Sequence, residues 1–165
     1  GQGNIVEQTE SDRKPPSGLQ RLLWRAPIWC YRIGLGGLLG KRLMLLVHTG
    51  RKSGQTRQAV VEVVGFDPAT NIYTVASGFG AKSDWYRNVC ATPNVTIQVG
   101  SRRMQATARP LSSGESGAAM VDYAHRYPSL ARALAKVIGH QVDGSDETYR
   151  RIAEQHIPFV EFHVQ

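Results

Sequence analysis

A glycine-rich turn between two apolar runs constrains the fold of this chain more than any other feature. The run 43–47 leads into the turn at 48–57, and a second run, 59–64, follows it. Short apolar runs bounded by glycine and polar residues are typical of strands. Because the connection between them is short, the runs are expected to pair as antiparallel neighbours. The first strand, 43–48, is almost continuously apolar, which predicts burial on both of its faces.

The composition of the turn indicates an anion-binding site. Gly50 and Gly54 can adopt positive φ, so that several backbone N–H groups can converge on one bound group. Arg51, Lys52 and Arg57 can supply charge-assisted hydrogen bonds to the same group. The Lys-Ser pair precedes the last glycine, which excludes a Walker A loop. A basic turn that is simply solvated remains the alternative.

The positive charge of the chain is concentrated in its first third. Residues 1–57 hold ten Lys or Arg and three Asp or Glu, a balance of +7, whereas residues 58–165 hold ten of each. Such a one-sided distribution favours an anionic ligand or an anionic surface over a uniformly basic nucleic-acid-binding coat.

The remaining periodicity predicts a mostly antiparallel barrel with helical additions. The predicted strands are 43–48, 58–66, 72–77, 95–99, 103–109 and 158–164, six in all. The predicted helices are 84–91, 112–127, 129–138 and 145–155. Ser83 is the expected N-cap of the first helix, and Ser112 with Glu115 forms a capping box at the start of the second.

The N-terminal region is expected to stand apart from the barrel core. Residues 1–17 are polar and are predicted to form a flexible tail, whereas residues 18–165 are predicted to form a single domain. Residues 18–40 combine Leu, Trp and Arg in an amphipathic helical segment that suits a membrane interface or a lid over an apolar pocket. The alternative is a helix packed on the barrel. The absence of a secretory signal and of an apolar run near the ~20 residues of a membrane span predicts a cytoplasmic location, with the inner face of the plasma membrane left open.

Cysteine and histidine spacing indicates neither a disulfide framework nor a metal centre. Cys30 and Cys90 lie far apart without a CxxC motif, and each is interpreted as a small buried apolar residue. The five histidines show no metal-binding spacing, so no metal is expected.

Two ordered motifs resemble the deazaflavin-dependent nitroreductase family of the flavin and deazaflavin oxidoreductases. The first is 49–57 (TGRKSGQTR) and the second 76–88 (ASGFGAKSDWYRN). The hairpin after Pro93-Asn94 and the segment 157–160 are also similar to that family. The resemblance is strongest over 41–110.

The resemblance implies a split β-barrel of the FMN-binding type that binds coenzyme F-420, an 8-hydroxy-5-deazaflavin with a phospholactyl-polyglutamate tail; FMN is the less favoured alternative. By position, the phosphate end would be held by Arg51, Lys52, Ser53, Gln55 and Arg57. The corner over the deazaflavin ring would comprise Ala76, Ser77, Gly78, Phe79, Gly80 and Ala81. The helix that completes the pocket would contribute Trp85, Tyr86 and Asn88.

The implied reaction is hydride transfer from the reduced deazaflavin to a small unsaturated, quinone-like or nitroaromatic substrate. Tyr123 and Tyr127 share one face of a predicted helix and are the candidate proton donors. Ser77 could hydrogen-bond the ring or a substrate oxygen. The alternatives are that both tyrosines pack on the barrel and that Ser77 caps a turn.

Two other classes of function stay open. The first is a carrier of the same barrel fold that stores deazaflavin, FMN, haem or a fatty acid without reductase activity. The second is a protein that binds anionic lipid or nucleic acid through residues 13–57, of which nucleic acid is the less favoured. Barrels of this type often form dimers, so a homodimer is a further hypothesis.

Overall fold

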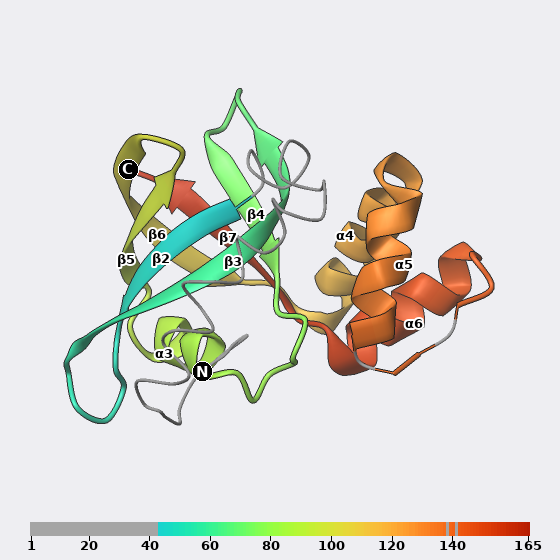
Figure 1. Cartoon of the computed structure of the whole chain (residues 1–165), viewed down its shortest axis with the longest axis horizontal. Helices are drawn as coiled ribbons and strands as arrows, with labels where there is room; N and C mark the ends of the chain where they lie inside the picture. Colours follow the sequence, from blue (N-terminus) through green and yellow to red (C-terminus); the bar gives the residue numbers. More distant parts are fainter. Residues whose placement is uncertain (1–42, 138, 141) are drawn as a thin grey trace, which may run out of the picture.

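Six antiparallel strands form a closed barrel in the computed structural model, which describes residues 43–137, 139–140 and 142–165 (Figure 1). The strand order around the barrel is β2-β3-β4-β7-β6-β5. The strands are β2 Leu43–Thr49, β3 Thr56–Asp67, β4 Ile72–Ala76, β5 Asn94–Val99, β6 Arg102–Pro110 and β7 Phe159–Val164. The helices are α3 Asp84–Ala91, α4 Ser113–Arg126, α5 Pro128–Val137 and α6 Asp146–His156. The predicted six-stranded barrel with α-helical additions is confirmed.

The apolar runs around the glycine-rich turn pair as predicted, from Leu43 opposite Glu62 to Thr49 opposite Thr56. The predicted burial of β2 on both faces is wrong. Met44, Leu46 and His48 are buried, whereas the residues between them are only half-buried. An antiparallel barrel strand sends alternate side chains into the interior, so only one face of β2 enters the core.

The last strand of the chain closes the barrel. β7 lies between β4 and β6, with Val160 opposite Val75 and Phe162 opposite Ala108. The interior is filled by inward-facing side chains of all six strands, among them Met44, Leu46, Val75, Ile97 and Phe162. A closed barrel leaves no unpaired strand edge, so the site has to be built at an end of the barrel or on its surface.

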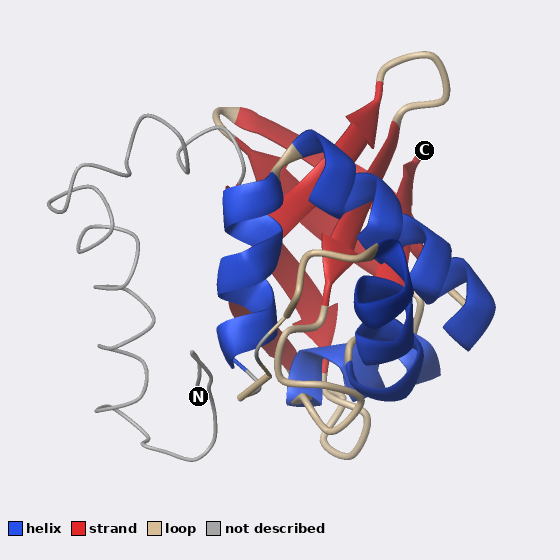
Figure 2. Ribbon diagram, turned by 90° about the vertical axis from the view of Figure 1, so that its right-hand side faces the viewer, coloured by secondary structure: helices blue, strands red, loops and turns tan. Residues whose placement is uncertain are grey.

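Helix α3 lies near the β2–β3 turn, apart from the other three helices (Figure 1). Helices α4, α5 and α6 group together beside the barrel, on the side that faces the viewer in Figure 2. Their shared core contains Met120, Tyr123, Ile152 and Ile157, together with Phe159 from the start of β7. The predicted capping box opens α4: the Glu115 backbone N–H donates to Ser112 Oγ at 3.1 Å, and the Ser112 N–H donates to Glu115 Oε1 at 2.9 Å.

Two local predictions are corrected by the structure. Ser83 is the N-cap residue of α3, but its side chain makes no capping hydrogen bond and instead lies 3.4 Å from Ser77 Oγ. Cys90 is exposed rather than buried, because the last turn of α3 presents it to solvent. Cys30 and the segment 18–40 lie outside the described residues. None of the described helices is long and apolar enough to cross a membrane.

Candidate functional site

The β2–β3 turn is closed by its own hydrogen bonds. The Gly50 N–H donates to the Gln55 carbonyl at 2.8 Å, and the Gly54 N–H donates to the Gly50 carbonyl at 2.8 Å. The Gln55 N–H donates to Ser53 Oγ at 3.1 Å. Gly54 has a φ of +72°, and a Cβ on Gly50 would lie only 2.8 Å from Ser53 Oγ. Gly54 is therefore favoured for its backbone conformation, and a side chain at position 50 would have to displace the Ser53 hydroxyl.

The polar side chains of the turn face solvent. Lys52, Ser53, Gln55 and Arg57 are exposed, while the Arg51 side chain is 21% exposed. Within the described part of the chain, neither Lys52 nor Arg57 has an acidic partner. Two exposed cations beside hydroxyl and amide groups fit a phosphodiester or carboxylate ligand, because such donors form charge-assisted hydrogen bonds to anionic oxygens.

Helix α3 holds the beginning of this turn. Oδ1 of Asn88 accepts hydrogen bonds from the Arg51 backbone N–H at 3.0 Å and from Arg51 Nη1 at 2.8 Å. Arg51 Nη2 also lies 3.4 Å from Asp84 Oδ1. Asn88 itself is only 2% exposed. The structure thus joins two of the predicted cofactor residues, Arg51 and Asn88, directly to each other.

His48, which was not among the predicted site residues, completes this network. The ring is 4% exposed, and its Nδ1 lies 3.1 Å from Asn88 Nδ2. Burial lowers the pKa of His48 to about 4; the positive charge of Arg57 adds to this shift and Asp84 opposes it. The ring is therefore neutral at neutral pH. A histidine among apolar residues, immediately before a glycine-rich turn, was the signal in the sequence that could have identified it.

The second predicted corner follows β4. Ser77 is 1% exposed, its Oγ donates to the Gly80 carbonyl at 2.7 Å, and its backbone N–H donates to the Pro158 carbonyl at 2.9 Å. Gly80 has a φ of +88°. In this arrangement Ser77 closes its own turn, which favours the turn-capping interpretation. Ser77 as a contact of the ring or the substrate remains a prediction.

The neighbours of Ser77 face in different directions. Ala76 is half-buried at the end of β4, and Gly78 packs so closely on α5 that a Cβ would lie 3.1 Å from Leu134 Cδ1. Phe79 is 60% exposed. An exposed aromatic ring on a glycine corner provides a flat apolar surface, which suits a planar ligand.

A cavity of about 210 Å³ opens beside this corner. Ala81 and Tyr86, both predicted cofactor residues, line it together with Leu111, Ser113, His156 and Pro158. The ring of Trp85, the remaining predicted residue of α3, packs edge-on against Tyr86 with a centroid separation of 6.0 Å. Burial raises the pKa of Tyr86, and the neighbouring Cys90 adds to the shift through its charge and a hydrogen bond.

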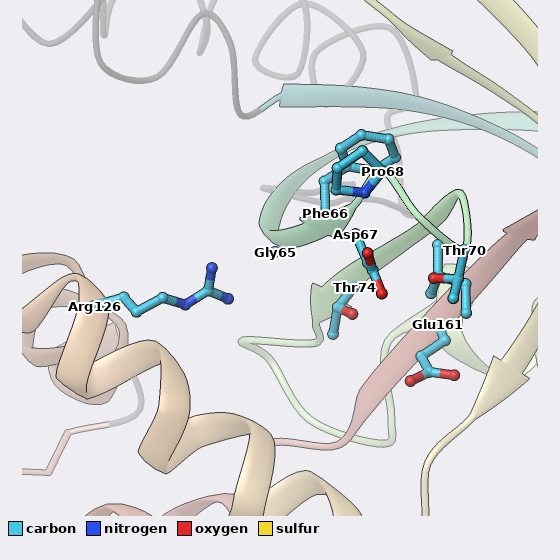
Figure 3. A pocket seen from close by; sticks show the side chains of 9 residues that line it. Gly65, Phe66, Asp67, Pro68, Thr70, Thr74, Arg126 and Glu161 are labelled. Carbon is cyan, nitrogen blue, oxygen red and sulfur yellow. The ribbon is translucent and has the colours of Figure 1, made fainter.

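A larger cavity of about 360 Å³ lies elsewhere (Figure 3). It is lined by Phe66, Thr74 and Glu161, and Arg126 extends toward it from α4. Its residues from β3 come from the end of that strand opposite the β2–β3 turn. None of the predicted site residues lines it, so the larger cavity is separate from the predicted coenzyme site.

The two predicted proton donors lie in the helical core. Tyr123 is 1% exposed, and its hydroxyl donates to Glu62 Oε2 on β3 at 3.1 Å. Tyr127 is half-buried at the end of α4, with its ring centroid 5.9 Å from that of Tyr123. This placement of Tyr123 favours the alternative that it packs on the barrel. A catalytic role for either tyrosine stays a prediction.

Sequence comparison gives a family match and relatives of similar sequence. The family model described as F420H(2)-dependent quinone reductase matches residues 25–136. A Mycobacterium tuberculosis protein provisionally named as such a reductase is 35% identical over 86 residues, which span 51% of this chain and 71% of that protein. A second M. tuberculosis protein, named F420H(2)-dependent quinone reductase, is 33% identical over 84 residues, 47% of this chain and 56% of its own length.

Solved structures show the same fold. A structure described as an F420-H2 dependent reductase superposes with a TM-score of 0.50 at 22% identity, covering 74% of this chain and 95% of its own. Another, described as a domain-swapped dimer, also has a TM-score of 0.50 and 22% identity, and covers 84% of this chain and 99% of its own.

Proposed function

Because the chain belongs to the F420H(2)-dependent quinone reductase family, we propose that it reduces a small quinone with hydride from reduced coenzyme F-420. The family assignment confirms the predicted resemblance, the predicted coenzyme and the class of deazaflavin-dependent reductase. The family description names quinone as the acceptor, which is why a quinone is preferred here to a nitroaromatic compound.

The single observation that carries the proposal is the extent of the family match. Residues 25–136 include both the cationic turn at 49–57 and the glycine corner at 76–88. A likeness confined to the barrel strands would indicate the fold alone, whereas this one includes the two segments in which the coenzyme-binding residues are predicted.

The residues of the cationic turn fit the anionic end of the coenzyme. Lys52 and Arg57 are exposed cations without acidic partners among the described residues, and Ser53 and Gln55 add hydrogen-bonding groups. The glycine corner with exposed Phe79 offers an apolar surface for a planar ring. When bound, the coenzyme supplies a hydride from a ring carbon.

Reduction of a quinone to a hydroquinone takes up two electrons and two protons. The hydride brings both electrons and one proton, so a second proton has to reach a quinone oxygen. Tyr86 lines the cavity beside the corner. Its phenol carries its proton at neutral pH, because the ordinary pKa of a tyrosine is 10.0 and burial raises it further. A protonated phenol can donate a hydrogen bond to a carbonyl oxygen in that cavity. Ala81, Leu111 and Pro158 make part of the cavity wall apolar, which suits an aromatic substrate.

The test of the proposal has two parts. Coenzyme binding is measured by fluorescence titration, with FMN as the comparison ligand. The reduced coenzyme is then mixed with a quinone, an enone or a nitroaromatic compound, and its re-oxidation is followed by absorbance. Binding of the coenzyme with quinone-dependent re-oxidation is the expected result. Binding without re-oxidation by any acceptor would instead support a carrier, and no binding would exclude both.

Three further proposals accompany this function. A homodimer is supported by the similar structure described as a domain-swapped dimer. A peripheral membrane contact through residues 18–40 would bring the enzyme close to membrane-dissolved quinones. It would place the protein, predicted to be cytoplasmic, at the inner face of the plasma membrane. The membrane contact and the location both concern the N-terminal segment, whose role stays a prediction.

A further inference from the structure

A chain of hydrogen bonds runs from inside the barrel to the cationic turn. It begins at the ring of His48 on β2, passes through the side-chain amide of Asn88 on α3, and ends at the backbone and guanidinium of Arg51. His48 and Asn88 are 4% and 2% exposed. The hydrogen bonds therefore link the strand before the turn, the turn itself and the helix beside it through two buried side chains.

The donors and acceptors in this chain leave one arrangement. Oδ1 of Asn88 faces two N–H donors of Arg51, so the amide must direct Nδ2 toward His48. Nδ1 of His48 must then accept, which places the ring proton on Nε2. A protonated ring would set an N–H against an N–H. The lowered pKa of His48 agrees with this neutral form.

The same chain fixes the first cation of the turn. Arg51 donates to Asn88 Oδ1 from its backbone N–H and from Nη1, and it donates to Asp84 Oδ1 from Nη2 at 3.4 Å. Within the described residues, these contacts occupy two of the five guanidinium N–H groups. The others can serve a ligand, and the backbone of the turn is held in place before any ligand arrives.

We propose that His48 and Asn88 are positioning residues for the coenzyme: they hold Arg51 and the start of the turn in the conformation that receives the anionic tail. This inference rests on the proposed function. Ordering a flexible cationic loop upon binding would cost affinity, and a loop that is already ordered avoids that cost. Neither residue needs to touch the coenzyme for this effect.

Two substitutions interrupt this chain of hydrogen bonds without a large change in side-chain size. His48→Phe removes the acceptor, and Asn88→Leu removes both the donor and the acceptor. Val89→Ala is the matched control, because Val89 is a fully buried residue of the same helix that packs in the barrel core. Each variant is measured for unfolding, for coenzyme Kd, and for KM and kcat separately.

The expected result is a rise of about tenfold in coenzyme Kd and KM for His48→Phe and Asn88→Leu, with kcat within about twofold of wild type. Val89→Ala should lose stability yet keep the wild-type Kd. In the absence of coenzyme, the Arg51 amide should exchange its hydrogen at least about tenfold faster in His48→Phe and Asn88→Leu than in Val89→Ala.

Asn88→Asp adds a readout that a purely structural role would not move. The carboxylate introduced at position 88 still accepts from Arg51. It accepts from the Nδ1–H of His48 as well, and this bond becomes a charge-assisted ion pair only when the ring is protonated. Arg57, Asp84 and Arg51 are the other charged groups around this pair. Coenzyme affinity of this variant should therefore improve as the pH falls through the raised pKa of His48, whereas the wild-type protein should show no such gain.

The outcomes separate the two proposals. Wild-type protein that does not bind coenzyme F-420 would overturn the proposed function. The positioning role alone would be overturned by a different result: the wild type binds the coenzyme, and His48→Phe and Asn88→Leu are folded with unchanged Kd and unchanged exchange of the Arg51 amide. If either variant unfolds, the Asn88→Asp profile decides: a pH profile parallel to that of the wild type would likewise overturn the role.

Discussion

Asn88 and Arg51, 37 residues apart in the sequence, meet at one oxygen atom. Oδ1 of Asn88 accepts from the Arg51 backbone N–H at 3.0 Å and from its guanidinium Nη1 at 2.8 Å. A helix and a turn that belong to two separate sequence motifs are therefore bonded directly to each other. The other half of the amide bonds His48, so the burial of a histidine inside the barrel is coupled to the geometry of the turn.

The buried His48 predicts a loss of stability in mild acid. The pKa of its ring is about 4 in the folded protein and 6.5 as the ordinary value. Above pH 6.5 the His48 ring is mostly neutral in both the folded and the unfolded protein. As the pH falls toward 4, the ring becomes protonated in the unfolded chain but stays neutral in the folded protein. The free energy of unfolding should therefore fall with decreasing pH by up to about 1.4 kcal/mol per pH unit in this window.

Urea unfolding at several pH values checks this, with His48→Gln as the control. The variant keeps a polar side chain but has no ring to titrate, so its stability should depend less steeply on pH between 6.5 and 4. Parallel curves for the two proteins would show that His48 is not the group responsible.

Gly50→Ala should weaken coenzyme binding. A Cβ at this position would lie 2.8 Å from Ser53 Oγ and 3.4 Å from Arg57 Nε, and displacing Ser53 breaks its bond to the Gln55 N–H. The loss of one hydrogen bond corresponds to about 1 kcal/mol, and we expect a rise of about fivefold in coenzyme Kd.

The control for this substitution is Gly114→Ala. Gly114 lies in the first turn of α4, and nothing stands within 4 Å of the Cβ that would be added. Alanine is the better helix former, so the variant should be neutral or slightly stabilised, with an unchanged Kd. Equal affinities for wild type and Gly50→Ala would contradict a binding role for the compact turn.

Lys52→Ala and Arg57→Ala should each weaken coenzyme binding without a measurable change in thermal unfolding. Both side chains are exposed, so an effect of about fivefold per cation at low salt is expected, with a larger effect for the double variant. Added salt should reduce the wild-type affinity for the same reason.

Arg102→Ala provides the matched control for the two cations. Arg102 is also exposed, but the β2–β5 pairing places the β5–β6 turn at the other end of the barrel from the cationic turn. Fluorescence titration should give an unchanged Kd for this variant. A loss of affinity as large as that of Lys52→Ala would indicate attraction by the net charge of the protein rather than by this turn.

Tyr123→Phe should reduce stability and spare catalysis. The hydroxyl is buried and donates to Glu62, so its removal should cost about 1–2 kcal/mol. Tyr149→Phe is the control, because Tyr149 is 3% exposed in the same helical core and its hydroxyl has no hydrogen bond among the described residues. A large fall in kcat with unchanged stability would instead support Tyr123 as the proton donor.

Much of the local structure could be predicted from the sequence. α3 has the predicted bounds, Asp84–Ala91, and β3 extends only two residues before and one after the predicted 58–66. The capping box forms as predicted. These features depend on residues close together in the chain: apolar periodicity, turn glycines and capping side chains act within a few positions, so the sequence carries them directly.

The site depended on contacts that no local pattern contains. Burial of His48, the exposure of Cys90 and the bond of Tyr123 to Glu62 all follow from which elements pack together, and the sequence does not show that packing. The motifs indicated an anion-binding turn and a glycine corner, and the amino-acid sequence determined both. The tertiary structure alone decided that α3 contacts the turn, because the folded barrel places Asn88 within hydrogen-bonding distance of Arg51 and His48, which precede it by 37 and 40 positions.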